Sequence, residues 1–178
     1  MSLIREFKPT ILFLVKFLGF YLILNLLYGF FIDAYSPLPD PVTRWVSVQS
    51  TSILNLFQYR IEYADHQYQP SINLILDGQD VILSIFEGCN GLNVIIIFVS
   101  FLLSFGKLSP RLIWFIPLGL IIIHIFNVLR ILLLFLISVH WPDAMYFAHK
   151  YLFTAILYVV IFVLWYFWLN KLYVIKNT

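Results

Sequence analysis

Residues 112–137 read LIWFIPLGLIIIHIFNVLRILLLFLI, a run that is apolar almost from end to end. A helix needs about 20 consecutive apolar residues to cross a membrane, so this run predicts a membrane-spanning helix. Apolar runs of the same kind occupy residues 10–32, 88–105 and 148–170, and the second of them is short for a span. The sequence therefore predicts about four transmembrane helices.

The overall composition indicates the same class. Hydrophobic residues make up 62% of the 178 residues and charged residues only 11%, and the mean hydropathy is +0.92. These values lie outside the range of soluble domains. We predict one membrane-embedded domain over residues 1–178, all-α and polytopic, in contact with membrane lipids. The net charge of +2 and the scattered basic residues argue against nucleic acid as a partner.

The segment 33–87 lacks transmembrane character. Asp40 and Pro41 predict a helix start, because Asp is a preferred N-cap and Pro a preferred first helical residue. From there to about Tyr59, the mixture of polar and apolar residues predicts an amphipathic helix on the membrane surface or packed against the bundle. A further span over residues 41–60 is the other possibility, and the polar residues in this stretch argue against it.

A short β-hairpin is predicted over residues 72–85. Two apolar-rich stretches flank Asp77-Gly78, a dipeptide that favours the positive φ angles of a tight turn. The predicted hairpin leads directly into Cys89. The expected fold is thus a helical membrane protein with a small extracytoplasmic segment made of one helix and one hairpin.

Basic residues predict the orientation, because short loops rich in Lys and Arg stay in the cytoplasm. With four spans and an inward N-terminus, both termini are cytoplasmic and the acidic segment 33–87 lies outside. Cys89 and His149 then begin inward-running helices at the outer surface, and Arg130 lies roughly 10 Å before the end of an outward-running helix. The basic residues assigned to the cytoplasmic side are Arg5, Lys8, Lys107, Arg111, Lys171 and Lys176.

The only cysteine, Cys89, lies in the sequence Glu87-Gly88-Cys89-Asn90-Gly91. A free cysteine in a membrane helix is commonly an inert packing residue. Here the flanking glycines predict an accessible sulfur, and a helix N-terminus stabilises a thiolate. Glu87 opposes that stabilisation. Cys89 is therefore a candidate nucleophile.

Arg130 lies within an apolar run and therefore needs an explanation. Its guanidinium could simply snorkel to the interface. Yet burying an arginine in a span costs roughly 2.5–3.5 kcal/mol on insertion scales, so such residues usually face a partner or a polar cavity. Asn127, one turn earlier, indicates that this face of the helix is polar.

His149 is the best-placed histidine, although an interfacial histidine beside Lys150 could also have no chemical role. His124 lies too deep to reach the thiol and is interpreted as a packing or interhelical hydrogen-bonding residue. His66 and His140 lie in outer loops and remain second choices.

These residue types together indicate acyl transfer. A thiolate paired with a histidine can attack a carbonyl, and the histidine can protonate the leaving amine. An arginine beside them can stabilise the oxyanion. No cofactor is required, and one cysteine with scattered histidines lacks the ligand spacing of a metal site.

The chain resembles the exosortase/archaeosortase family in three stretches. They read EGCNGL at residues 87–92, NVLRI at 127–131 and AHK at 148–150. The predicted hairpin before the cysteine is also similar, and the short chain looks most like the compact F-type exosortases. Many members have Ser at the position of Asn90 and Arg at that of Asn93.

The resemblance implies a cysteine protease or transpeptidase in the cytoplasmic membrane of a prokaryote, acting at the outer face. Its partners would be exported proteins that end in a short motif, a membrane helix and a basic tail. Cys89 would form a thioester with the new carboxyl end, His149 would act as general acid and base, and Arg130 would hold the oxyanion. An amine, glycan or lipid acceptor, or water, would then release the product.

Two other classes remain open at this level. The chain could be a nonenzymatic membrane assembly or sorting partner, in which Arg130 forms a structural ion pair with Glu87 or Asp143. It could also be a lipid-modifying enzyme that uses Arg130 on a lipid phosphate, but no metal-binding carboxylates or second basic ligand support that chemistry.

Overall fold

The computed structural model describes residues 2–105 and 109–173, with side chains from residues 7–105 and 109–171. Lys107 and Lys176, which the sequence analysis assigns to the cytoplasmic side, lie outside the described residues, and so does the side chain of Arg5. The structure is mostly helical with one small antiparallel sheet, as the sequence predicts for this membrane protein.

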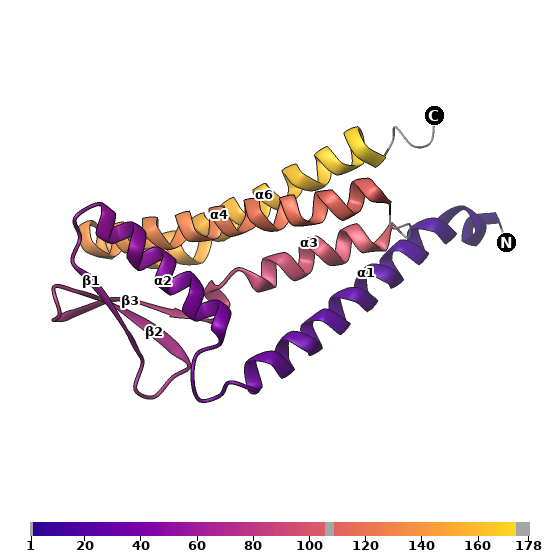
Figure 1. Cartoon of the computed structure of the whole chain (residues 1–178). Coiled ribbons are helices and arrows are strands. Elements are labelled where there is room, and N and C mark those ends of the chain that lie inside the picture. Colours follow the sequence, from indigo (N-terminus) through magenta and orange to yellow (C-terminus); the bar gives the residue numbers. More distant parts are fainter. Residues whose placement is uncertain (1, 106–108, 174–178) are drawn as a thin grey trace.

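Four helices run lengthwise through the molecule and alternate in direction (Figure 1). They are α1 (Ser2–Asp33), α3 (Leu92–Ser104), α4 (Pro110–His140) and α6 (Phe153–Phe167). The two termini lie at one end of this bundle, and the sheet lies at the opposite end (Figure 1). α3 packs against α1, α4 and α6.

Three helical segments are long and apolar enough to cross a membrane, namely Phe7–Asp33, Pro110–His140 and Pro142–Lys171. The run predicted over 88–105 is helical only at Leu92–Ser104, a shorter apolar helix. Its 13 residues extend about 20 Å, less than the roughly 30 Å hydrocarbon thickness. The helix starts late because Gly91, at its N-cap, has a φ of +86°, which a helical residue cannot adopt.

Helix α2 (Pro41–Leu56) begins where the sequence predicts. The Asp40 carboxylate accepts hydrogen bonds from the backbone N–H groups of Val42, at 2.9 Å, and Thr43, at 3.0 Å. These bonds satisfy donors that a helix start leaves free. α2 packs against α4 and the sheet and is not among the segments long and apolar enough to span a membrane, which favours the predicted packing against the bundle.

The sheet contains the predicted hairpin and one additional strand. β2 (Ser71–Leu76) pairs with β3 (Asp80–Phe86) across the turn at Asp77 and Gly78, both of which have positive φ. β1 (Ile61–Asp65) pairs with the other side of β2, giving an antiparallel sheet in the order β1-β2-β3. The sequence of β1 does not show the alternation of apolar and polar residues that marks a half-buried strand. In the structure only Ile61 of its five residues is buried.

A hydrophobic core joins the sheet and α2 to the C-terminal half of α4. Its buried members are Val46, Leu54, Ile61, Leu74, Ile85, Cys89, Ile131 and Phe135. Cys89 belongs to this core, so the loop that carries it is fixed relative to α4. A second core, around Phe98 and Ile123, holds the other half of the bundle. There α3 and α4 approach closely, since a Cβ on Gly119 would lie 2.2 Å from the Phe98 ring.

The last helical segment starts earlier than the predicted span at 148–170. Two short turns, η2 (Pro142–Ala144) and α5 (Met145–Phe147), precede the π-helical turn η3 (Ala148–Leu152), which continues into α6 and the π-helical end η4 (Trp168–Tyr173). His149 therefore lies in a widened turn of a continuous helical segment.

Candidate active site

Cys89 ends a single 3₁₀ turn, η1 (Glu87–Cys89), which connects β3 to α3. Its side chain is 6% exposed, and its Sγ atom lies 3.8 Å from Nε2 of His149. The sequence predicts an accessible sulfur on account of the two flanking glycines. That prediction is wrong, because the thiol packs into the core beneath the sheet.

His149 contacts both other predicted site residues. Its Nε2 atom lies 3.8 Å from Sγ of Cys89 and 3.5 Å from Nη2 of Arg130. The π-helical turn places it there, and such turns are frequent at functional sites. The structure thus brings together Cys89, Arg130 and His149, residues from three separate elements.

These contacts limit how the site can be protonated. The Arg130 guanidinium can only donate hydrogen bonds, so Nε2 of His149 must be the acceptor. A ring that accepts there carries its proton on Nδ1, and its single Nε2 lone pair accepts either from the guanidinium or from the Cys89 thiol. A neighbouring guanidinium also opposes a second positive charge on the imidazole.

Burial raises the pKa of the Cys89 thiol, and the positive charge of Arg130 partly offsets this by favouring the thiolate. Arg130 is itself 9% exposed, and its Nε atom has no hydrogen-bond partner among the described residues. The arrangement therefore contains a thiol, an imidazole nitrogen and a cation with a free donor.

Asn127, one turn before Arg130 on α4, holds the cysteine loop. It is completely buried, and its Nδ2 donates a 2.9 Å hydrogen bond to the carbonyl oxygen of Cys89. Its Oδ1 is unpartnered among the described side chains. The sequence predicts a polar face here but not this backbone anchor.

The two glycines of the loop have steric roles. A Cβ on Gly91 would lie 3.1 Å from Cγ of Asn127, and the residue has a left-handed φ of +86°. A Cβ on Gly88 would lie 2.4 Å from the Phe86 ring. The glycines therefore allow the loop to pack closely against α4 and against Phe86.

Asn90 connects the loop to α1 and α2. Its Nδ2 donates to the Tyr28 hydroxyl at 3.3 Å and to the Thr43 hydroxyl at 3.2 Å, while its Oδ1 accepts from the backbone N–H of Leu92 at 2.9 Å. Tyr28 in turn donates to the carbonyl oxygen of Glu87 at 3.0 Å. The Thr43 hydroxyl donates to the Asp40 carboxylate.

Sequence reasoning missed Tyr28 and Thr43 as parts of this loop network. Asp40 was predicted only as a helix cap. Tyr28 is one tyrosine within an apolar run. No sequence pattern connects it with Glu87 and Asn90, its hydrogen-bond partners, which lie about 60 residues later. The polar residues next to Asp40 were the only sequence feature that could have indicated this network.

The other histidines lie outside the site. His124 is hydrogen-bonded to Gln49 at 2.8 Å and stacked on Trp45 with the ring centres 4.4 Å apart, which agrees with its predicted interhelical role. His140 contacts Tyr59, and His66 accepts from the backbone of Tyr68.

The structural ion pair expected for a nonenzymatic partner is not formed. Within residues 7–105 and 109–171, Arg130 has no ion pair with Glu87 or Asp143, and its closest polar contact is His149. A buried guanidinium directed at a Cys–His pair therefore favours the catalytic interpretation.

Comparison with known proteins gives one match. A model of the transmembrane exosortase family matches residues 7–170, a range that includes every member of the site. No curated protein and no solved structure matches the chain. Because the match covers nearly the whole sequence and agrees with the membrane helices and the small sheet, the chain belongs to the transmembrane exosortase family, whose members are membrane-embedded cysteine transpeptidases that process sorting signals.

Proposed function

We propose that this chain cleaves C-terminal sorting signals of exported proteins through a thioester on Cys89. The observation that carries the proposal is the position of His149 Nε2, 3.8 Å from the thiol and 3.5 Å from the Arg130 guanidinium. Nε2 of His149 is therefore close enough to take the thiol proton of Cys89. It also lies beside the Arg130 guanidinium, the cation that would stabilise the oxyanion formed by the attack.

The first half-reaction begins when Nε2 of His149 accepts the thiol proton. The thiolate attacks the scissile carbonyl carbon, and the negative charge that develops on the carbonyl oxygen is stabilised by Arg130. His149 then returns its proton to the leaving amine as the C–N bond breaks. The upstream part of the substrate remains attached to Cys89 as a thioester.

The second half-reaction transfers that acyl group. An amine, glycan or lipid hydroxyl, or water, loses a proton to His149 and attacks the thioester carbonyl, and the sulfur leaves and recovers the proton. Arg130 again faces the oxyanion. The unpartnered Nε atom of Arg130 supports this role, because a buried donor without a partner is costly unless a ligand completes it.

The orientation forms part of the proposal. Lys8 lies near the start of α1 and Lys171 in η4, the last helical turn of the described chain. The termini lie at one end of the bundle, and the sheet and α2 lie at the opposite end (Figure 1). The excess of basic residues near the termini places that end in the cytoplasm of a prokaryotic cell. Cys89 then faces the extracytoplasmic side, where an exported substrate arrives.

A cleavage assay in membranes tests the proposal. An exported reporter is joined to a short motif, a membrane helix and a basic tail, and its trimming is followed with the variants Cys89→Ala, Arg130→Ala and His149→Ala. All three should leave the reporter at full length, while His140→Ala and Arg44→Ala serve as matched controls and retain trimming. Unchanged trimming by Cys89→Ala, in a variant that inserts normally, contradicts the proposal.

A further inference from the structure

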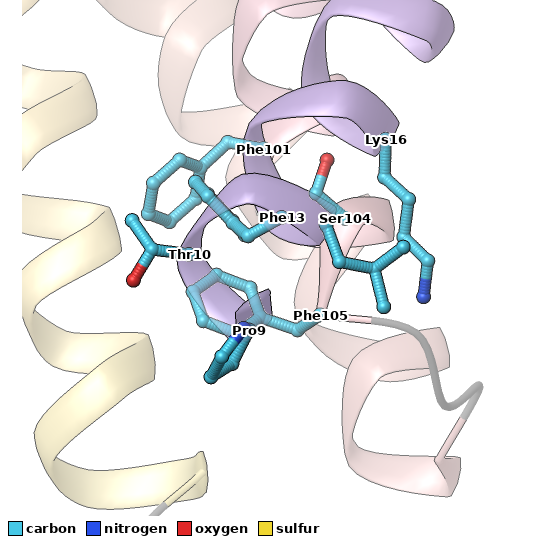
Figure 2. A pocket seen from close by; sticks show the side chains of 8 residues that line it. Pro9, Thr10, Phe13, Lys16, Phe101, Ser104 and Phe105 are labelled. Atoms are coloured by element: carbon cyan, nitrogen blue, oxygen red, sulfur yellow. The ribbon is translucent and has the colours of Figure 1, made fainter. Parts of the chain in front are cut away.

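A pocket of about 520 Å³ lies between α1 and α3, at the end of the bundle that holds the termini (Figure 2). It is formed where α3 ends, whereas Cys89 precedes the start of that helix, so the pocket is about 20 Å from the candidate active site along α3. Its main lining residues are Thr10, Phe13, Lys16, Phe101, Ser104 and Phe105.

Lys16 supplies a positive charge to this pocket. It lies nine residues after the start of the membrane-spanning segment Phe7–Asp33, about 14 Å along the helix, and is half-buried. It has no ion pair with any described side chain. Figure 2 shows its side chain running along α1 toward the N-terminal end of that helix, as expected for a lysine that reaches toward the interface.

Aromatic rings form the apolar wall of the pocket. Phe13 contacts Phe101 and Phe105, with ring centres 5.5 Å and 5.0 Å apart, and Phe101 lies 5.2 Å from Phe105. The hydroxyl of Thr10 makes no hydrogen bond to a described residue and is exposed at the rim. Lys16 thus stands beside an apolar surface, while the Thr10 hydroxyl points away from it on the other side of the pocket (Figure 2).

We propose that this pocket binds an anionic phospholipid. The phosphate group would accept hydrogen bonds from Lys16, and an acyl chain would lie against the wall formed by Phe13, Phe101 and Phe105. Charge complementarity selects this occupant, because an unpaired lysine in a membrane span attracts an anionic headgroup. A cationic peptide segment would be repelled by the same lysine. The proposal stands independently of the activity proposed for Cys89.

Native mass spectrometry of the full chain in detergent tests the assignment. The protein is titrated separately with phosphatidylglycerol and phosphatidylcholine of identical acyl chains. We expect phosphatidylglycerol to bind about fivefold more tightly, the effect of one lysine near the headgroup. Lys16→Gln should remove this preference, and Lys16→Arg should retain it.

Two further variants distinguish lipid binding in the pocket from a general attraction of anionic lipids to basic residues on the surface. Lys171→Gln removes a cation from another helix at the same end of the molecule and should leave the preference unchanged. Thr10→Trp keeps Lys16 but fills the rim, and should weaken the binding of both lipids. A preference that survives Lys16→Gln, or that Lys171→Gln reduces equally, overturns the proposal.

Inorganic phosphate provides the remaining arm of the experiment. If sodium phosphate fails to displace bound phosphatidylglycerol, the acyl chain contributes to binding and the lipid assignment holds. If it displaces the lipid and protects the protein from thermal unfolding to the same extent, the site takes free phosphate and the lipid assignment is wrong.

Discussion

At the scale of single residues, the site depends on a shared contact with one nitrogen atom. His149 Nε2 contacts the thiol of Cys89 and the guanidinium of Arg130, and only a neutral ring has a lone pair there to accept a hydrogen bond or a proton. Proton transfer from Cys89 to His149 leaves the thiolate beside two cations, the imidazolium and the Arg130 guanidinium, and the guanidinium favours the thiolate.

This arrangement predicts the pH dependence of Cys89 alkylation. Burial raises the thiol pKa and Arg130 lowers it, so Arg130→Gln should raise the pKa further. The midpoint of the alkylation profile with iodoacetamide then moves to higher pH, and at lower pH the thiolate fraction falls about tenfold for each unit of pKa. The single cysteine makes the label unambiguous. Arg44→Gln is the control, and a midpoint unchanged in Arg130→Gln refutes this account of the arginine.

Tyr28 carries a second prediction at this scale. Tyr28→Phe removes the hydroxyl that donates to the Glu87 carbonyl and accepts from Asn90. The loss should lower the free energy of unfolding by about 1 kcal/mol, the usual net value of such a hydrogen bond. Thermal unfolding in detergent measures it. Tyr21→Phe, on the same helix, should change stability little, because the Tyr21 hydroxyl makes no hydrogen bond to a described residue; equal effects of both variants would argue against the network.

The three central residues of the site could be singled out from the sequence. Each is either chemically reactive or costs free energy to place at its position in or beside an apolar run. Cys89, Arg130 and His149 interrupt or border apolar runs, and burial of such groups usually has a function. Tyr28 and Thr43 could not be predicted as loop anchors, since their partner Asn90 is distant in sequence and neither type is unusual in its segment.

At the scale of elements, the turn between β3 and α3 decides the geometry of the site. The hairpin and the start of α2 were predictable from local chemistry, namely Asp77-Gly78 and Asp40-Pro41. The start of α3 was not, because the apolar run continues toward the cysteine while the left-handed conformation of Gly91 delays the helix to Leu92. Strand β1 was missed because its own sequence has no clear strand pattern. It is stabilised by pairing with β2.

Gly91→Ala tests the role of this turn. An alanine there adopts an unfavourable φ and brings its Cβ to 3.1 Å from Asn127, so we expect a loss of about 1–3 kcal/mol in stability together with loss of reporter trimming. Gly19→Ala in α1 meets no atom within 4 Å and should be neutral or stabilising, since alanine favours helix by up to about 1 kcal/mol. Thermal unfolding of both variants decides, and equal stability contradicts the assigned strain.

At the scale of the whole molecule, the sheet and α2 cover the C-terminal half of α4 and fix the cysteine loop against it. Arg130 lies farther from the end of its helix than the sequence indicated. α4 continues to His140, so Arg130 lies ten residues, about 15 Å, from its end. The number and order of the helices followed from hydropathy, but the separation of Arg130 from the helix end depends on where α4 ends, and helix ends are the least certain part of a sequence-based prediction.

The orientation yields a prediction for the intact cell. In a Cys89→Ser background, Gln79→Cys in the exposed hairpin turn should react with a membrane-impermeant maleimide from outside. Lys171→Cys, near the opposite end, should react only after the cells are permeabilised, because basic residues mark the cytoplasmic side. Labelling of Lys171→Cys in intact cells would reverse the topology.

The central claim is that the acyl group of a sorting substrate passes through the sulfur of Cys89. The most direct measurement is intact mass spectrometry of the chain isolated from membranes that contain the tailed reporter. The account predicts an adduct with the mass of the upstream reporter fragment, located on Cys89, released by hydroxylamine and absent from Cys89→Ala. Trimming of the reporter without any hydroxylamine-sensitive adduct, or with an adduct that persists in Cys89→Ala, would contradict it.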